Sequence, residues 1–407
     1  MDLKKYKLGE ILDVTRGASL SGEYYAAEGK YVRLTCGNFN YQNNCFKENK
    51  SKDNLYYIGD FKPQFLMEEG DIITPLTEQT IGLLGSTAII PESGKYIQSQ
   101  DVAKIVCKEN LLDKDFAFYL ISSPIVKQQL SVAAQQTKIR HTSPDKIKDC
   151  TVWIPELVKQ KRIGKLLRTL DRKIELNRQI NQNLEAMAKQ LYDYWFVQFD
   201  FPNEEGKPYR SSGGEMVWNE KLKREIPKDW EVTNIGNILG KVISTPRLST
   251  NEYLVDGIYP VIDQTTEVYY AGFTDRKEAV VGQYPAVIFG DHSCAVKYVN
   301  FPFVRGADGT QVMLSNNTNI SIEYLYFVVK NIKIGKGYAR HYSFLKEQLI
   351  VVPSNMIAEK FEKITQNLME QITRNKKENQ ALAKQRDELL PLLMNGQVAV
   401  NSDLTHD

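Results

Sequence analysis

The sequence predicts an α+β protein: two similar mixed α/β domains, separated by two long helices that pair as an antiparallel coiled coil. Three observations predict this arrangement. The chain has 407 residues, enough for about two to four domains. Part of the sequence repeats at a fixed offset of 198 positions, which indicates a duplicated plan with a pseudo-twofold internal repeat. Two segments of roughly 40 residues carry heptad spacing.

The composition is that of a folded protein. Lys and Arg total 52 and Asp and Glu total 50, so the formal net charge of +2 argues against a polycationic tail and against an acidic mimic of DNA. The 5 cysteines include no CxxC pair, so we expect neither a disulfide framework nor a zinc site. We find no signal peptide and no run of ~18–20 apolar residues, so we expect a cytoplasmic protein without a membrane partner.

The repeat is clearest around the predicted helices. Residues 151–155 (TVWIP) reappear as 349–353 (LIVVP), and the same offset relates Asn177 to Asn375 and Asn181 to Asn379 without a gap. Upstream the offset changes, which indicates that the second domain is the shorter one. The order along the chain is therefore domain, helix, domain, helix.

The spacer helices are expected at residues 155–198 and 353–397. At 1.5 Å per residue each is about 60 Å long, and the second closes on Asn395-Gly396, a helix C-cap signal. In an antiparallel pair, facing residues have a constant sum of residue numbers. Asn177 with Asn379 and Asn181 with Asn375 both give 556, so we expect a central polar layer that fixes register, flanked by Leu184 and Leu382. The alternative is that each helix packs only on its own domain.

The two domains are expected at residues 1–154 and 230–352, with a linker by composition at 199–229 and a tail at 398–407. Short β-like runs occur at 31–35, 71–74, 86–90 and 102–106, and again at 259–262, 286–289 and 311–314. Helices are expected at 114–130 and 321–331.

A search for catalytic motifs finds none. The sequence contains no GxxxxGK[ST] loop, no GxGxxG after a strand, no Asp/Asn-Pro-Pro-aromatic tetrapeptide and no HExxH. We therefore expect no catalytic or metal-binding residue in this chain. Two similar lobes suit a target that repeats along an axis, such as duplex DNA. A non-catalytic coiled-coil adaptor and a nuclease with an unrecognised site remain as alternatives.

Three segments carry a family resemblance: residues 199–219 (FDFPNEEGKPYRSSGGEMVWN), 225–230 (EIPKDW) and 386–398 (RDELLPLLMNGQV). The chain resembles, over essentially its whole length, the specificity (S) subunit of Type I restriction–modification systems. The resemblance implies that each domain is a target recognition domain for one half of a bipartite, asymmetric site in double-stranded DNA. It implies that the coiled coil sets the spacing and docks two modification (adenine-methyltransferase) subunits.

The same resemblance implies two restriction subunits, which are ATP-dependent translocases and nucleases. The assembled complex would then be a Type I site-specific deoxyribonuclease and DNA adenine-N6 methyltransferase that defends against phage. No cofactor is implied in this chain; S-adenosylmethionine, ATP and magnesium are expected on the partner subunits.

Candidate DNA contacts follow the paired strands of each domain. In the first domain they are Thr35, Asn38, Asn40, Gln79, Lys138, Arg140 and His141, and in the second Asp263, Gln264, Thr265, His292, Arg340 and His341. Arg and Lys suit guanine and phosphate, whereas Asn and Gln suit adenine. We expect Arg140 and Arg340 to contact phosphate, because two different half-sites should not share a base-reading residue. The alternative for each is an ordinary solvated loop residue.

The phosphate assignment is testable at Arg340. Arg340→Ala should weaken DNA binding by the methylating complex about equally for all sequences, because a phosphate contact carries no base information. Binding to a set of duplexes that differ at single positions measures this. A loss of discrimination at one base pair would contradict the phosphate role.

Overall fold

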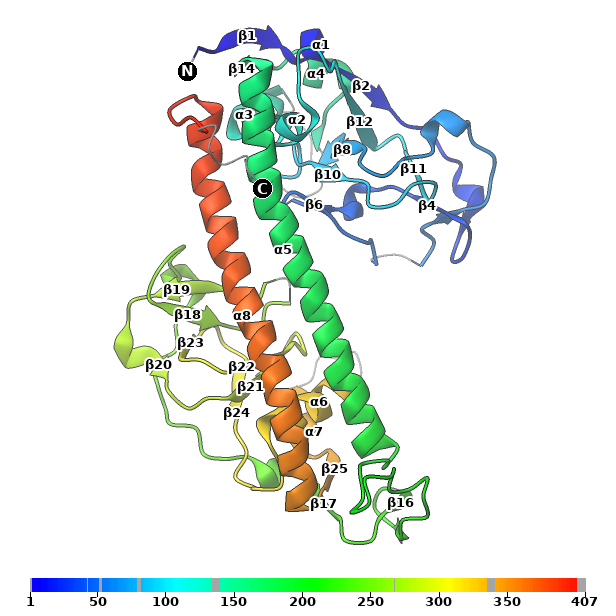
Figure 1. Cartoon of the computed structure of the whole chain (residues 1–407), viewed down its shortest axis with the longest axis vertical. Coiled ribbons are helices and arrows are strands. Elements are labelled where there is room, and N and C mark those ends of the chain that lie inside the picture. The colour runs from blue at the N-terminus through cyan, green and yellow to red at the C-terminus, as the bar shows by residue number, and fades with distance from the viewer. Residues whose placement is uncertain are drawn as a thin grey trace. The chain divides into compact units, whose positions relative to one another are not determined.

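The computed structural model of the chain describes residues 2–41, 43–50, 53–78, 82–133, 140–266, 268–334 and 341–400. The chain forms two compact units, which are treated separately below. The first unit comprises Met1–Ile174 and Gln380–Asp407, and the second comprises Glu175–Asn379. Both boundaries fall inside the two longest helices, α5 (Leu157–Tyr192) and α8 (Asn355–Met394), so each unit contains part of both helices (Figure 1).

The first unit is built on two four-stranded sheets. One sheet is antiparallel with the order β10-β8-β12-β2, and the other has the order β11-β4-β7-β3 with β4 and β11 parallel. Further two-stranded pairs are β1–β14, β5–β6 and β9–β13. The strands are β1 (Lys4–Lys7), β2 (Leu12–Arg16), β3 (Tyr25–Ala26), β4 (Tyr31–Arg33), β5 (Phe39–Asn40), β6 (Cys45–Phe46), β7 (Tyr56–Tyr57), β8 (Ile72–Pro75), β9 (Thr77–Glu78), β10 (Ala88–Ile89), β11 (Tyr96–Ile97), β12 (Val102–Cys107), β13 (Arg140–His141) and β14 (Thr151–Ile154).

The helices of the first unit correct one prediction. In place of a single helix over residues 114–130, the structure has α2 (Lys114–Ile121) and α3 (Pro124–Ala133). Pro124 explains the break, because proline disfavours a helical conformation in the residue before it and is tolerated at the first position of a helix. The side chain of Asp113 caps α2 by accepting the Phe116 N–H at 2.9 Å. Two short helices, α1 (Leu8–Ile11) and α4 (Pro144–Lys148), complete this unit.

The second unit repeats the plan with fewer strands. A four-stranded sheet has the order β19-β18-β23-β20, with β18 and β23 parallel, and a three-stranded sheet has the order β22-β21-β24. Two-stranded pairs are β15–β16 and β17–β25, and the helices are α6 (Ile322–Asn331) and α7 (His341–Lys346). The strands are β15 (Met216–Asn219), β16 (Arg224–Pro227), β17 (Glu231–Asn234), β18 (Tyr259–Ile262), β19 (Gly272–Thr274), β20 (Val280–Val281), β21 (Ala286–Gly290), β22 (Val296–Val299), β23 (Phe303–Arg305), β24 (Thr310–Met313) and β25 (Leu349–Val352).

The internal repeat is visible in individual hydrogen bonds. In the first unit Ala18 bridges to Ser99, and the Gln98 side chain donates to the Thr15 carbonyl at 2.8 Å. In the second unit Leu248 bridges to Gly306 in the same parallel sense, and the Arg305 side chain donates to the Thr245 carbonyl at 3.3 Å. The two units therefore share a backbone frame although their side chains differ. These findings confirm the predicted α+β class and internal repeat.

Within the second unit, α5 and α8 pair through the asparagine layer. The Asn177 amide donates to Asn379 Oδ1 at 2.9 Å and to Glu378 Oε2 at 2.6 Å, and the Asn375 amide donates to Asn181 Oδ1 at 2.8 Å. Asn177 and Asn375 are 1% and 5% exposed, so these bonds replace lost contacts with water. The pairing is antiparallel, and the structure brings together both pairs expected from the sequence. Leu184 packs, half-buried, against the core of this unit.

Within the first unit, the same two helices pair through an ion pair. Arg386 Nη1 lies 2.7 Å from Asp171 Oδ1, with side-chain exposures of 8% and 16%. The carboxylates of Asp171 and Asp387 hold the pKa of Arg386 above its usual value despite its burial, and the Tyr119 hydroxyl also donates to Asp171. Ile163 and Leu167 of α5 share a core with Leu393 and Met394 of α8. Leu382 is half-buried in this part of α8.

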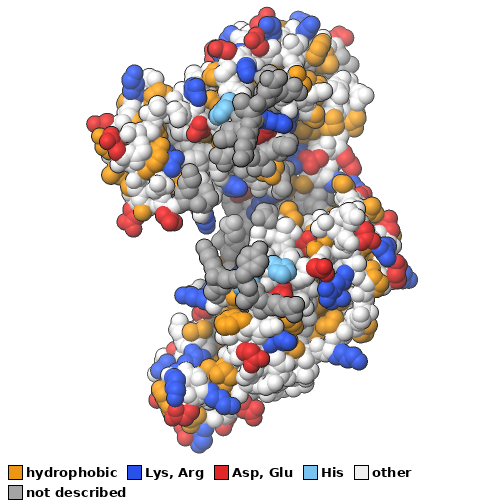
Figure 2. Space-filling view, turned by 180° about the vertical axis from the view of Figure 1, so that it is seen from behind, with side chains coloured by type: hydrophobic (Ala, Val, Ile, Leu, Met, Phe, Trp, Pro, Cys, Tyr) orange, Lys and Arg blue, Asp and Glu red, His pale blue; other side chains and the backbone are white. Residues whose placement is uncertain are grey.

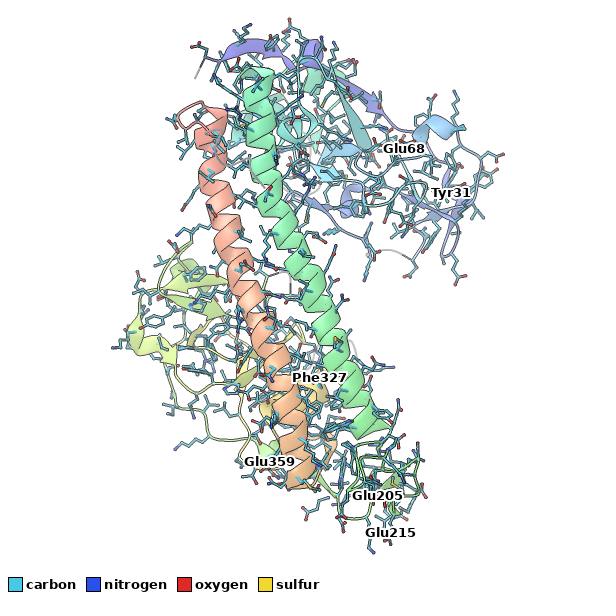
Figure 3. All side chains as sticks on the ribbon, in the orientation of Figure 1. Tyr31, Glu68, Glu205, Glu215, Phe327 and Glu359 are labelled. Carbon is cyan, nitrogen blue, oxygen red and sulfur yellow. The ribbon has the colours of Figure 1, made fainter. Side chains whose placement is uncertain are left out.

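An aromatic core holds the sheets of the second unit to both long helices. Phe327 points from α6 toward α5 and α8 (Figure 3), with ring centroids 5.7 Å from Tyr192 and 6.4 Å from Phe361. The end of α5 continues as one π-helical turn, Asp193–Val197, which buries Trp195 and Phe196 in the same core. Both long helices are thereby fixed to this domain.

The segment expected from its composition to be a linker, residues 199–229, is folded into the second unit. Phe201 stacks on Trp230 at 4.9 Å between ring centroids, and Phe199 is 1% exposed. Asp200 accepts the N–H of Ser211 at 2.7 Å and its hydroxyl at 2.6 Å, which closes the loop. Glu205 and Glu215 lie in this segment (Figure 3). The buried aromatic residues Phe199 and Phe201 therefore fold this segment onto the second unit, although its composition is largely polar.

The C-terminal helix ends as its sequence predicts. Gly396 has φ +70°, and the N–H of Gln397 donates to the Leu392 carbonyl at 2.9 Å, as in a glycine C-cap. None of the helices in the described parts of the chain has the length and apolar character that crossing a bilayer requires.

The asparagine layer makes a prediction for stability. Asn177→Leu with Asn379→Leu should raise the melting temperature of the transition that reports the second unit by about 2–4 °C, because a buried polar layer costs stability while fixing register. Calorimetry of the full chain measures it.

The matched control is Asn183→Leu with Asn367→Leu, which replaces two exposed asparagines of the same helices. An unchanged or lower melting temperature in the buried pair would count against a layer that is retained for register.

Candidate nucleic-acid interface

In the first unit, three segments meet at the β9–β13 pair. His141 lies opposite Thr77, and Arg140 lies opposite Glu78. Cys36, in the turn after β4, contacts the Thr77 hydroxyl with its Sγ at 2.8 Å, and burial raises the pKa of its thiol. The structure therefore brings the turn at residue 35 together with Arg140 and His141. Of these residues, His141 is exposed.

The turn after β4 corrects the assignment of Asn38. Its side chain is 1% exposed, its Oδ1 accepts the Thr35 N–H at 2.9 Å, and its amide donates to the Lys47 carbonyl at 3.3 Å. Asn38 therefore caps a turn, and its burial disfavours the proposed contact with DNA. The Thr35 hydroxyl oxygen accepts from Gly37 and Asn49.

Asn40 lies next to this turn and is half-buried. Its Oδ1 accepts the N–H of Asn43 at 3.2 Å, so it also stabilises a loop. Of the two asparagines proposed to read adenine, Asn40 is the one whose side chain reaches solvent.

Arg140 is held by a buried acid. Glu78 is 5% exposed, and its Oε2 lies 3.4 Å from Arg140 Nη1, which also donates to the Ser131 hydroxyl at 3.4 Å. The Arg140 side chain keeps 33% of its surface exposed. Because a guanidinium carries five N–H donors, Arg140 can keep this partner and still offer donors to a phosphate.

In the second unit, the turn after β18 corrects the assignment of Asp263. This residue is 6% exposed, its Oδ1 accepts the Thr265 N–H at 2.9 Å, and its Oδ2 accepts the Tyr253 hydroxyl at 3.3 Å. Burial and the nearby Asp263 carboxylate raise the pKa of Tyr253, which keeps it a donor. The Thr265 hydroxyl also donates to Asp263. Asp263 is therefore a structural acceptor, and Thr265 is half-buried beside it.

Gln264 connects three segments of the same edge. Its amide donates to the Asp308 carbonyl at 2.8 Å, its Oε1 accepts the His292 N–H at 3.1 Å, and its backbone carbonyl accepts the Ser293 hydroxyl at 2.6 Å. The His292 side chain is exposed beside it. Gln264 and His292 are thus brought together, with His292 the more available for contact.

His341 is corrected by its burial, since it is 8% exposed at the start of α7. The next residue, Tyr342, donates its N–H to Asp291 Oδ1 at 2.7 Å, which joins this segment to the turn after β21. Gln79, Lys138 and Arg340 lie outside the described residues, so their proposed contacts remain predictions.

Some residues at these edges were not found from the sequence. Glu78, on β9, and Asp291, directly after β21, were not among the candidates, although both follow strands whose ends carry candidate residues. Arg305 lies beside Ile262 through a parallel strand pair, and burial and the nearby Arg247 lower its pKa. Parallel pairing over this sequence separation leaves no local pattern that could have identified it.

The charge on the surface is mixed in sign. Figure 2 shows Lys and Arg side chains interspersed with Asp and Glu on the face in view, in keeping with the formal net charge of +2. Among the described residues, no group of three or more His, Cys, Asp or Glu side chains could hold a metal ion. The described edges therefore suit selective contacts with polar groups better than indiscriminate binding to phosphates.

Comparison with known proteins identifies relatives of this chain. Residues 1–186 match the family model described as "Type I restriction modification DNA specificity domain". The chain is 26% identical to the Type I restriction enzyme MjaIX specificity subunit of Methanocaldococcus jannaschii, with 74% of this chain and 73% of the relative covered. It is 24% identical to the Type I restriction enzyme HindI specificity subunit of Haemophilus influenzae, with 74% and 81% covered.

Among solved structures, the S subunit of a Type I restriction–modification system from M. genitalium has the same fold. Its TM-score is 0.59 at 17% identity, with 97% of this chain and 96% of that chain covered. The resemblance seen in the sequence is confirmed by these matches.

Proposed function

We propose that this chain is the DNA-specificity subunit of a Type I restriction–modification system, because residues 1–186 match the model of the Type I restriction modification DNA specificity domain. The family match is the observation that carries this proposal. The curated relatives, which extend over 74% of the chain, support the same role for the second unit. The chain selects the DNA site, and chemistry belongs to partner subunits.

We further propose that the recognised site is bipartite and asymmetric. Each unit has a candidate DNA-binding edge, formed by the turn after β4 in the first unit and the turn after β18 in the second, with the segments bonded to each turn. The two edges carry different side chains. Thr35, Asn40 and His141 belong to the first edge, and Gln264, Thr265 and His292 to the second. A shared frame with different contacting groups supports two different half-sites.

The two long helices are proposed to set the spacing between these half-sites and to dock two adenine-methyltransferase subunits. α5 has 36 residues and α8 has 40, and each passes from one unit into the other within a single helix. Two restriction subunits would complete the assembly. S-adenosylmethionine, ATP and magnesium would be bound by these partners.

The spacing role makes a direct prediction. Removing one heptad from each helix shortens the pair by about 10 Å, equal to about 3 base pairs at 3.4 Å each, so the gap between half-sites should shrink by that amount. Methylome sequencing of cells that carry the chain with its modification partner reads the gap.

A control variant, with one heptad deleted and another inserted in each helix, keeps the length and should keep the gap. An unchanged gap in the shortened variant would contradict the spacing role. Metal-dependent cleavage of DNA by the purified chain alone would favour the nuclease alternative.

A further inference from the structure

In each unit an acid at the candidate DNA-binding edge bonds to a separate segment of the chain. In the first unit this is Glu78, which follows β8 on the short strand β9. In the second unit it is Asp291, which directly follows β21. We refer to Glu78 and Asp291 as the acid tethers.

Glu78 gathers donors from two separate segments. Its Oε1 accepts the N–H groups of Gly82, Leu83 and Leu84 at 2.7, 3.0 and 3.3 Å, and its Oε2 faces Arg140. Hydrogen bonds to an ionised carboxylate are stronger than neutral ones, so this acid holds the start of the loop before β10 against β13. The Arg140 guanidinium, 3.4 Å away, offsets the negative charge of this carboxylate.

Asp291 holds the second edge with a simpler set of bonds. Its Oδ1 accepts the Tyr342 N–H at 2.7 Å, and its own N–H donates to the Gly309 carbonyl at 2.8 Å. The adjoining His292 N–H donates to Gln264. Three chain segments, at Gln264, Gly309 and Tyr342, are therefore bonded to one turn.

We propose that the acid tethers are positioning residues, each of which determines how well one half-site is discriminated while leaving the other half-site unaffected. The inference rests on the proposed function. Base discrimination requires donors and acceptors held in fixed positions. Glu78 holds the segment that carries Arg140 and His141, and Asp291 holds the turn that carries His292 against the segment at Tyr342. The tethers themselves contact no base.

The test uses the full chain in complex with its modification subunit. The split site is first read from the methylome of the wild-type system, and methylation is then measured on duplexes that carry every single-base change of that site. Glu78→Ala and Asp291→Ala should each lower the preference for the correct base about tenfold. This is within the range by which one mismatched base pair weakens specific binding. The loss should be confined to one half-site, and to opposite half-sites for the two variants.

Conservative variants separate positioning from charge. Asp291→Asn keeps an oxygen that accepts the Tyr342 N–H, so it should discriminate like the wild type. Glu78→Gln keeps an acceptor for the three backbone N–H groups but turns an amide toward Arg140, so it should lose part of the preference at the same half-site as Glu78→Ala. If Glu78→Ala does not fold, Glu78→Gln carries the test.

Matched controls are Glu68→Ala in the first unit, which is labelled in Figure 3, and Glu278→Ala in the second. Both remove an exposed acid and should leave discrimination unchanged. Melting temperature and co-purification with the modification subunit show that each variant is folded and assembled.

The proposal would be overturned by unchanged discrimination in folded Glu78→Ala and Asp291→Ala, or by an equal loss at both half-sites. An Asp291→Asn variant as impaired as Asp291→Ala would also overturn it. Failure of the proposed function is separate, because it would appear as the absence of a split site in the wild-type methylome.

Discussion

The antiparallel pairing of α5 with α8 is the constraint on which both units depend. The core of the first unit takes Ile163 and Leu167 from one helix and Leu393 and Met394 from the other. The core of the second unit likewise takes Ala188 and Tyr192 from α5, with Phe361 and Ile372 from α8. Neither core is complete with one helix alone, so a slip in helix register would disturb both. The Asn177–Asn379 and Asn181–Asn375 hydrogen bonds favour this register over others, because a shifted pairing would leave buried amides without partners.

The long helices and the asparagine pairs were predicted well from the sequence, because they follow from local periodicity and from the internal repeat. Heptad spacing placed both long helices, and a constant sum of residue numbers placed the asparagine pairs. Features that depend on contacts between distant segments, and that leave no periodic or repeated pattern in the sequence, were not predicted. Asn38 and Asp263 have side chains suited to reading a base, but partners such as the Lys47 carbonyl and the Tyr253 hydroxyl make them structural. The folded state of residues 199–229 was missed for a related reason, since Phe199 and Phe201 find their partners only after the chain has turned back on itself.

Near-neutral charge and buried acids at the candidate interface have a common explanation. Binding through phosphates alone is insensitive to sequence and falls steeply with salt, so an excess of Lys and Arg would add affinity for every site. Selection among many competing sites depends on differences between sites instead. Glu78 fits this requirement, because its charge is offset by Arg140 while its hydrogen bonds order the proposed contact segments. Partner subunits that contribute phosphate contacts would leave this chain free to remain close to neutral.

The two repeated units keep the same supporting backbone contacts, although the side chains that make these contacts differ. Gln98 and Arg305 occupy corresponding places, and each donates a side-chain hydrogen bond to the carbonyl of a threonine, Thr15 or Thr245. One side chain is neutral and the other is charged, yet the bond that fixes the backbone is the same. The tethers behave similarly, since Glu78 uses a carboxylate to hold an arginine and three N–H groups, whereas Asp291 holds a single N–H. Selection on such a chain can change the side chains of one edge while the hydrogen bonds that support it persist. A change of sequence preference in one half-site therefore requires no change in the other half-site or in the paired helices.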